Sequence, residues 1–220
     1  MGKKLSRGDI IKALLEASFF CSAGETSLSD IANRLGIKKA SLYNHFSSRE
    51  DIIEQTLISS EDYLKSLTFV PPHLEQVAQR YTAETVLKGM VTRYFKMHEK
   101  NPLFQIYTFV ESQKYFSKKA ANIVQDEYEL LARQTQNTLY ALYSSQKISL
   151  PQEQIPGATA WFCSGLTNIL NRYLLDRKLL LMENPAIGEG ELFSLPSNDS
   201  ALEKVNTLTD AFVSLLRCSK

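Results

Sequence analysis

Residues 26–46, TSLSDIANRLGIKKASLYNHF, decide the fold that this sequence predicts. Ser27 is followed three residues later by Asp30, a pair typical of a capping box, so a helix is expected to begin directly after Ser27. Gly36 stands where a helix ends in a left-handed residue. A second short helix is expected over residues 38–44. Two short helices joined by a glycine turn predict a helix-turn-helix.

The two expected helices each have a buried side and a solvent side. Leu28, Ile31, Ala32 and Leu35 recur at helical spacing in the first, and Leu42 marks the buried side of the second. The outward side of the second helix offers donors and acceptors suited to phosphates and base edges. These residues are Lys38, Lys39, Ser41, Asn44 and His45. The alternative is a helical hairpin with an ordinary solvated face, because a helix-glycine-helix pattern alone is common.

A longer stretch, LSDIANRLGIKKASLYNHFSSRED, resembles the DNA-binding signature of TetR-family transcriptional regulators. The matching positions are Ile31, Ala32, Leu35, Gly36, Leu42, Tyr43, Phe46, Ser48, Arg49 and Glu50. Upstream, Ala17, Phe20 and Gly24 stand where that family keeps an alanine, a phenylalanine and a glycine. The resemblance covers residues 5–60, and beyond them only the helical architecture and a loose motif match.

The resemblance implies an all-α fold with two domains. Residues 1–48 are expected to form a three-helix helix-turn-helix domain, and residues 49–220 a larger helical domain for ligand binding and dimerisation. The implied function is a transcriptional repressor that binds a palindromic operator in double-stranded DNA as a homodimer. A small, largely apolar effector would release it. An all-α ligand-binding module and a helical enzyme are the alternatives.

The expected DNA contacts follow from the same resemblance and from the side-chain chemistry. They are Ser27, Ser29, Lys38, Lys39, Ser41, Tyr43, Asn44, His45 and Arg49. Ser27, Tyr43 and Arg49 are expected to hold phosphates, whereas Ser29 could reach either phosphate or base. Two adjacent lysines open the second helix, and lysine serves phosphate as readily as guanine.

Charge is distributed in a way that fits this assignment. The whole chain has a net charge of only +1. Residues 1–49, however, contain eight Lys or Arg and four Asp or Glu, so they are +4 and the remainder is −3. Positive charge is therefore concentrated where the DNA-reading element is expected.

The three cysteines and the apolar runs indicate a cytoplasmic protein. Cys21, Cys163 and Cys218 are odd in number and lack the spacing of a metal site, which favours a reducing compartment. The longest uncharged run, residues 154–171, contains Pro156 and Gly157, so it predicts a buried helix and no membrane span. We expect no metal and no cofactor.

Catalytic constellations are also missing from the sequence. His45, His73 and His98 are scattered, without the spacing of a metal site. No nucleophile elbow or phosphate-binding loop occurs. These observations argue against an enzyme.

The rest of the chain predicts helices. Ser6 caps a first helix whose inner face extends to Phe20 and Cys21, and a fourth helix is expected over Arg49–Lys65. Pro71 and Pro72 form the clearest break. After this break the apolar spacing predicts three further helices, the last of which extends to Leu142. Residues 183–198 predict a long loop.

Two late apolar stripes, Trp161–Leu174 and Ala201–Leu216, are wider than one neighbouring helix would need. Gly165 in the first stripe permits a close approach of two backbones. We therefore expect both helices to pair with their two-fold mates. The expected interface residues are Trp161, Gly165, Leu166, Ile169, Tyr173, Leu208, Phe212 and Leu215. The alternative is that both stripes complete the core of one chain.

Aromatic residues are numerous for a helical domain of this size. A core explains any one of them, but the resembled family keeps a small-molecule cavity among these helices, and aromatic walls suit such a site. The candidate effector-binding residues are Phe95, Phe104, Tyr107, Glu111, Trp161, Phe162 and Asn168. Glu111 on an otherwise apolar helix would favour a cationic compound.

Overall fold

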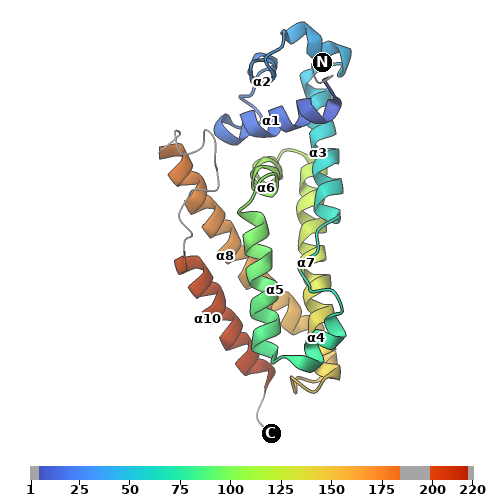
Figure 1. Cartoon of the computed structure of the whole chain (residues 1–220), viewed down its shortest axis with the longest axis vertical. Helices are drawn as coiled ribbons and strands as arrows, with labels where there is room; N and C mark the ends of the chain where they lie inside the picture. The colour runs from blue at the N-terminus through green and yellow to red at the C-terminus, as the bar shows by residue number, and fades with distance from the viewer. Residues whose placement is uncertain (1–4, 184–198, 218–220) are drawn as a thin grey trace. The chain divides into compact units, whose positions relative to one another are not determined.

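A computed structural model describes residues 5–183 and 199–217 (Figure 1). Within these ranges the chain forms helices and turns and no strand, as the expected all-α class requires. The helices are α1 (Arg7–Cys21), α2 (Leu28–Leu35), the 3₁₀ helix η1 (Lys39–Asn44), α3 (Arg49–Lys65), α4 (Leu74–Arg80), α5 (Ala83–His98), α6 (Leu103–Glu111), α7 (Lys118–Ser144), the 3₁₀ helix η2 (Gln152–Gln154), α8 (Ile155–Glu183) and α10 (Asp199–Leu216). The loop expected over residues 183–198 lies outside the described residues, apart from Glu183, which ends α8.

Packing divides the chain into two compact units. Unit 1 contains Met1–Ser66 and Asn101–Asp126, and unit 2 contains Leu67–Lys100 and Glu127–Lys220. Helix α7 contributes its first part to unit 1 and the rest to unit 2. Unit 1 therefore includes α3 and α6 in addition to the first three helices. The functional boundary between residues 48 and 49 stays a prediction.

Unit 1 is built around α1, which packs on α2, α3 and α6. Ser6 caps α1 through a capping box with Asp9, as its three-residue spacing predicts. Phe19 is buried, and its ring lies edge-on to that of Phe104, with 5.0 Å between the centroids. The prediction that Phe20 belongs to the inner face is wrong: its side chain is 36% exposed. The inner face turns towards Phe19 because that position meets α6.

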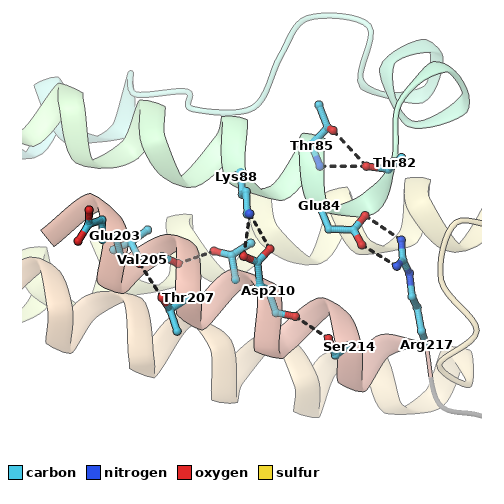
Figure 2. A network of polar contacts seen from close by, with 11 residues as sticks. Thr82, Glu84, Thr85, Lys88, Glu203, Val205, Thr207, Asp210, Ser214 and Arg217 are labelled. Carbon is cyan, nitrogen blue, oxygen red and sulfur yellow. Dashed lines mark hydrogen bonds and ion pairs between the residues drawn. The ribbon is translucent and has the colours of Figure 1, made fainter. Parts of the chain in front are cut away.

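Unit 2 contains α10 packed against both α5 and α8. Two ion pairs, drawn in Figure 2, join α5 to α10 and to Arg217, the residue that follows α10. Lys88 Nζ lies 2.6 Å from Asp210 Oδ1, and the Arg217 guanidinium binds both oxygens of Glu84 at 2.6 and 2.7 Å. Leu87 and Val91 of α5 and Val205 and Val213 of α10 are buried, so both helices contribute apolar side chains to the core of unit 2.

None of the helices in the described parts of the chain combines the length and the apolar content that a bilayer crossing needs.

Candidate nucleic-acid interface

Helix α2 begins and ends as its sequence predicts. The Ser27 side chain accepts a hydrogen bond from the Asp30 backbone N–H at 3.2 Å, and the Ser27 N–H donates to Asp30 Oδ2 at 2.7 Å. Hydrogen bonds to the Asp30 carboxylate from the Ser27 hydroxyl and, second, from the Ser27 backbone N–H hold the pKa of Asp30 below its usual value. Gly36 ends the helix with φ of 64° and ψ of 32°, the left-handed conformation. The Ile37 N–H then returns to the Ala32 carbonyl at 3.0 Å, which turns the chain sharply.

The second helix of the pair is shorter and tighter than the sequence predicts. Lys38 is extended, with φ of −76° and ψ of 141°, so the helix begins at Lys39 as a 3₁₀ helix and not as an α-helix at Lys38. Its bonds join residues three apart: Ser41 N–H to the Lys38 carbonyl, and His45 N–H to the Leu42 carbonyl, both at 2.9 Å. A turn this short satisfies few backbone groups by itself, so tertiary contacts must hold it.

Two apolar side chains anchor η1 in unit 1. Leu42 is 1% exposed and Phe46 is 3% exposed. Tyr43, between these two anchors in the sequence, is 54% exposed. Lys38, Lys39 and Asn44 are exposed, whereas Ser41 and His45 are half-buried. The structure therefore leaves Lys38, Lys39, Tyr43 and Asn44 exposed to solvent and Ser41 and His45 only partly so, and their assignment to DNA stays a prediction.

Ser27 and Ser29 lie at the start of α2, and both are exposed. The Ser27 hydroxyl oxygen already accepts the Asp30 N–H. The hydroxyl hydrogen of Ser27 also bonds to the Asp30 carboxylate, so a phosphate contact by Ser27 would compete with that bond. The assignment of both serines to DNA stays a prediction.

Arg49 has a role in the structure that the sequence does not indicate. Its guanidinium donates to three main-chain carbonyls in the turn between α1 and α2: Thr26 at 2.7 Å, Gly24 at 2.9 Å, and Ala23. The side chain is 25% exposed. These bonds tie the N-terminus of α3 to the turn that precedes the α2 cap. Arg49 thus stabilises the packing of α3 against this turn. A phosphate contact by Arg49 remains a prediction, and it would compete with the bonds to these carbonyls.

Arg7 is a residue that the sequence analysis missed. It lies 38 residues before His45, and its Nε and Nη2 both donate to the His45 carbonyl, at 2.9 and 2.8 Å. Its guanidinium also lies 4.9 Å from the centre of the Phe46 ring. No local spacing predicts this contact, because only the packing of α1 brings the two segments together.

Comparison with known proteins agrees with this geometry. The model of a family described as bacterial regulatory proteins, tetR family, matches residues 23–56. That range includes the turn held by Arg49, both helices of the pair and the beginning of α3. This segment of the chain is therefore similar to the DNA-binding part of tetR-family regulators.

The chain is also similar to IcaR of Staphylococcus aureus strain Newman, the HTH-type negative transcriptional regulator of the biofilm operon icaADBC. The two are 27% identical over 129 residues, which make up 58% of this chain and 64% of IcaR. The match therefore spans less than two thirds of that relative.

Solved structures share the fold over nearly the whole chain. A transcriptional regulator from Rhodococcus sp. Rha1 superposes with a TM-score of 0.62 at 12% identity, covering 98% of this chain and all of that one. A TetR transcription regulator from Haloarcula marismortui gives a TM-score of 0.59 at 11% identity, covering 96% and 97%. At these identities the likeness shows the TetR-type fold.

The residues expected at the dimer interface divide into two groups in the structure. Leu166, Tyr173 and Phe212 are each at most 2% exposed, so their side chains belong to the core of unit 2. The prediction that they face a partner is wrong for a single reason: α10 and α5 of the same chain cover that side of α8. A Cβ at Gly165 would lie 3.1 Å from Leu208 Cδ2, so this close approach also occurs within one chain.

Other members of that set keep an exposed surface. Trp161 is 54% exposed and Leu215 is 55% exposed, while Ile169 is half-buried. The alternative considered for the two stripes, a core within one chain, thus explains their inner residues. The exposed ones remain candidates for a partner surface.

The candidate effector-binding residues divide between the two units. Phe104, Tyr107 and Glu111 belong to unit 1, and Phe95, Trp161, Phe162 and Asn168 belong to unit 2. Within unit 2, Phe162 stacks on Phe212, and Asn168 is exposed. Within unit 1, the Glu111 carboxylate accepts a hydrogen bond from Lys114 Nζ at 2.7 Å. A lysine already occupies the position that a cationic effector would take at Glu111, which weakens that prediction.

Proposed function

We propose that this protein is a transcriptional repressor that reads a palindromic operator in double-stranded DNA. One observation carries the proposal: η1 presents Lys39, Tyr43 and Asn44 to solvent while Leu42 and Phe46 anchor its other side. Cationic and amide side chains on one short helix suit phosphate oxygens and base edges. The protein acts in the cytoplasm, where it meets the DNA.

Operator reading further requires two copies. One helix-turn-helix reads half a site, and two of them must stand about 34–36 Å apart to enter successive major grooves. A two-fold homodimer supplies that spacing most simply. The exposed side chains of Trp161 on α8 and Leu215 on α10 support an interface on these helices. A small, largely apolar effector then weakens operator binding by about 5–150-fold, the range of a typical allosteric coupling.

The DNA-binding half of the proposal is tested by selecting duplexes from a random-sequence pool with the full chain. The double variant Lys39→Ala, Asn44→Ala should no longer bind the duplex that the wild type selects, since each lost base contact costs about 1–3 kcal/mol. Its helical circular dichroism should match that of the wild type. Lys12→Ala is the matched control, because Lys12 is an exposed lysine of unit 1 on α1 that pairs with Glu16. If the double variant protects the same bases as the wild type, η1 does not read DNA.

The homodimer is tested by sedimentation. Trp161→Glu combined with Leu215→Glu should give a folded monomer that binds the selected duplex weakly, because charge on an exposed apolar contact opposes association. Leu166→Glu is the contrasting variant: it places a charge in the core of unit 2 and should unfold the protein. An unchanged dimer in the double variant would remove this surface from consideration.

Effector release is tested by a thermal-shift screen of neutral aromatic compounds and hydrophobic cations, followed by the same DNA-binding measurement with each stabilising compound. A compound that stabilises the protein and leaves duplex affinity unchanged would contradict release. If the protein were instead an all-α ligand-binding module, a compound would stabilise it but it would select no duplex. A helical enzyme would also select none, and it would consume the compound that it binds.

A further inference from the structure

The contact between Arg7 and His45 joins the beginning of α1 to the end of η1. Arg7 is the first residue of α1, and His45 directly follows η1. Two nitrogens of one guanidinium, Nε and Nη2, converge on a single carbonyl oxygen at 2.9 and 2.8 Å. Both residues lie in unit 1. The contact is therefore part of the same compact unit as the DNA-reading face.

The acceptor is a carbonyl at the C-terminal end of a helix. The last carbonyls of a helix lack partners within the helix and carry the negative end of its dipole. A guanidinium at this position satisfies the oxygen and places positive charge where the dipole favours it. The planar fork also fixes the direction of the carbonyl, which the single ammonium of a lysine does not do.

The aromatic ring of Phe46 adds a second constraint on Arg7. The guanidinium carbon lies 4.9 Å from the centre of that ring, within the range of a cation–π contact. Phe46 is buried, and its N–H bonds to the Leu42 carbonyl at 3.0 Å. Arg7 is therefore held between a fixed ring and a helix end, so its position is defined by the packing of unit 1.

The side chains that face solvent on η1 depend on this arrangement. Tyr43 and Asn44 immediately precede His45, and η1 is only six residues long. A helix this short has few hydrogen bonds of its own, so its last turn is set by what holds its end. At that end, two hydrogen bonds from Arg7 hold the His45 carbonyl.

We propose that Arg7 is a specificity-determining positioning residue, which orients the end of η1 through the His45 carbonyl and does not itself need to touch DNA. The proposal rests on the DNA-reading function proposed above. The competing role is a phosphate contact, which any exposed arginine near DNA can make. A phosphate contact changes affinity for every sequence alike and contributes about one unit to the salt dependence. A positioning contact changes the preference for one sequence.

The test compares Arg7→Lys with Arg7→Gln, and Lys12→Gln serves as the control because Lys12 is an exposed cation of the same helix. Affinity is measured for the duplex that the wild type selects and for a random duplex, over a range of salt concentrations. Arg7→Lys should lower the ratio of the two affinities by about tenfold, the loss of one charge-assisted hydrogen bond. Its affinity for the random duplex and its salt dependence should stay at the wild-type values. Lys12→Gln should leave the ratio unchanged.

Amide hydrogen exchange supplies a readout that general destabilisation would not reproduce. In Arg7→Lys, exchange should rise for residues 39–46 and stay at the wild-type level in α2. An Arg7→Lys protein that keeps the affinity ratio, while Arg7→Gln loses one unit of salt dependence, would make Arg7 a phosphate contact and overturn the proposal. Faster exchange throughout unit 1 would overturn it as well, since the effect would then be global.

The two proposals fail in different ways. A wild-type protein that enriches no sequence from the pool contradicts the DNA-reading function. A wild-type protein that enriches one sequence, together with an Arg7→Lys variant that reads it equally well, overturns the role of Arg7 alone.

Discussion

Phe162 of α8 stacks on Phe212 of α10, with ring centroids 4.1 Å apart and planes inclined by 12°. Both side chains are almost fully buried. Aromatic pairs at this distance contribute beyond the area that they bury. The two apolar stripes that the sequence assigns to a dimer are therefore joined, on their inner sides, within one chain.

Truncation of that stack should destabilise the monomer. We expect Phe212→Ala to lower the free energy of unfolding by about 3–5 kcal/mol, the usual cost of removing a buried phenylalanine. Leu215→Ala is the control on the same helix and should cost well under that, because Leu215 is 55% exposed. Urea unfolding measures both. A Phe212→Ala protein of wild-type stability would mean that α10 does not pack on α8 in solution.

Gly36 should resist substitution although space surrounds it. A methyl carbon added at this position would meet no neighbouring group within 4 Å, but φ is +64°, where a side chain costs about 1–2 kcal/mol. We expect Gly36→Ala to be destabilising by that amount. Gly89→Ala is the matched control, because Gly89 is also unobstructed and lies within α5. Because alanine favours a helix more than glycine does, Gly89→Ala should raise the free energy of unfolding by about 1 kcal/mol. Thermal or urea unfolding that shows equal effects of the two changes would contradict the left-handed turn.

Arg49 should contribute to stability and not to the salt dependence of DNA binding. Arg49→Gln removes donors from the carbonyls of Ala23, Gly24 and Thr26, which should cost about 1–3 kcal/mol. Arg34→Gln is the control, since the Arg34 side chain is 39% exposed and its pair with Glu16 is 3.9 Å long. Unfolding and salt titrations of DNA binding distinguish the roles. A stable Arg49→Gln protein whose salt dependence falls by about one unit would restore the phosphate assignment.

Glu61 should make stability depend on acid pH. Hydrogen bonds from Lys119 Nζ at 2.6 Å and Lys65 Nζ at 2.5 Å lower the pKa of Glu61 from 4.5 to about 2. A lowered pKa in the folded state means that the carboxylate stabilises the fold above pH 4.5, the unfolded pKa. This contribution disappears as the pH falls from about 4.5 towards 2.

The variant Glu61→Gln tests that dependence. It should be less stable than the wild type near neutral pH, and the difference should shrink as the pH approaches 2. Glu54→Gln, an exposed position on the same helix, should show no such change. A pH-independent difference between Glu61→Gln and the wild type would show that the two lysines do not hold the carboxylate in solution.

Two cysteines should differ in their reaction with thiol reagents. Cys163 is fully buried, and burial raises the pKa of its thiol to about 11. Cys21 is exposed. Because the thiolate is the reacting species, Cys21 should be modified in the native protein and Cys163 only after unfolding. Mass mapping of alkylated peptides, with and without denaturant, measures both. Rapid native labelling of Cys163 would show that α8 opens readily.

The sequence predicted the features of the DNA-reading element that depend on neighbouring residues. The Ser27 and Asp30 capping bonds span three residues, and the left-handed turn at Gly36 depends on the absence of one side chain. Such features can be predicted from the order of residues along the chain, because the interacting groups are separated by less than one turn of helix. The buried side of the second helix was also predicted at Leu42, which is 1% exposed.

The tertiary structure decided what covers each apolar face and where the long side chains reach. Periodicity shows that the stripe through Phe212 is buried, but a partner chain and a helix of the same chain would bury it equally well. The arginine contacts are similarly distant in sequence: Arg7 reaches a carbonyl 38 residues away, and Arg49 reaches one 26 residues away. The sequence by itself determined that this protein is helical and carries a helix-turn-helix, because those signals are local. Only the folded chain determined which of its arginines hold that element in place, because guanidinium groups find main-chain acceptors through packing and not through spacing.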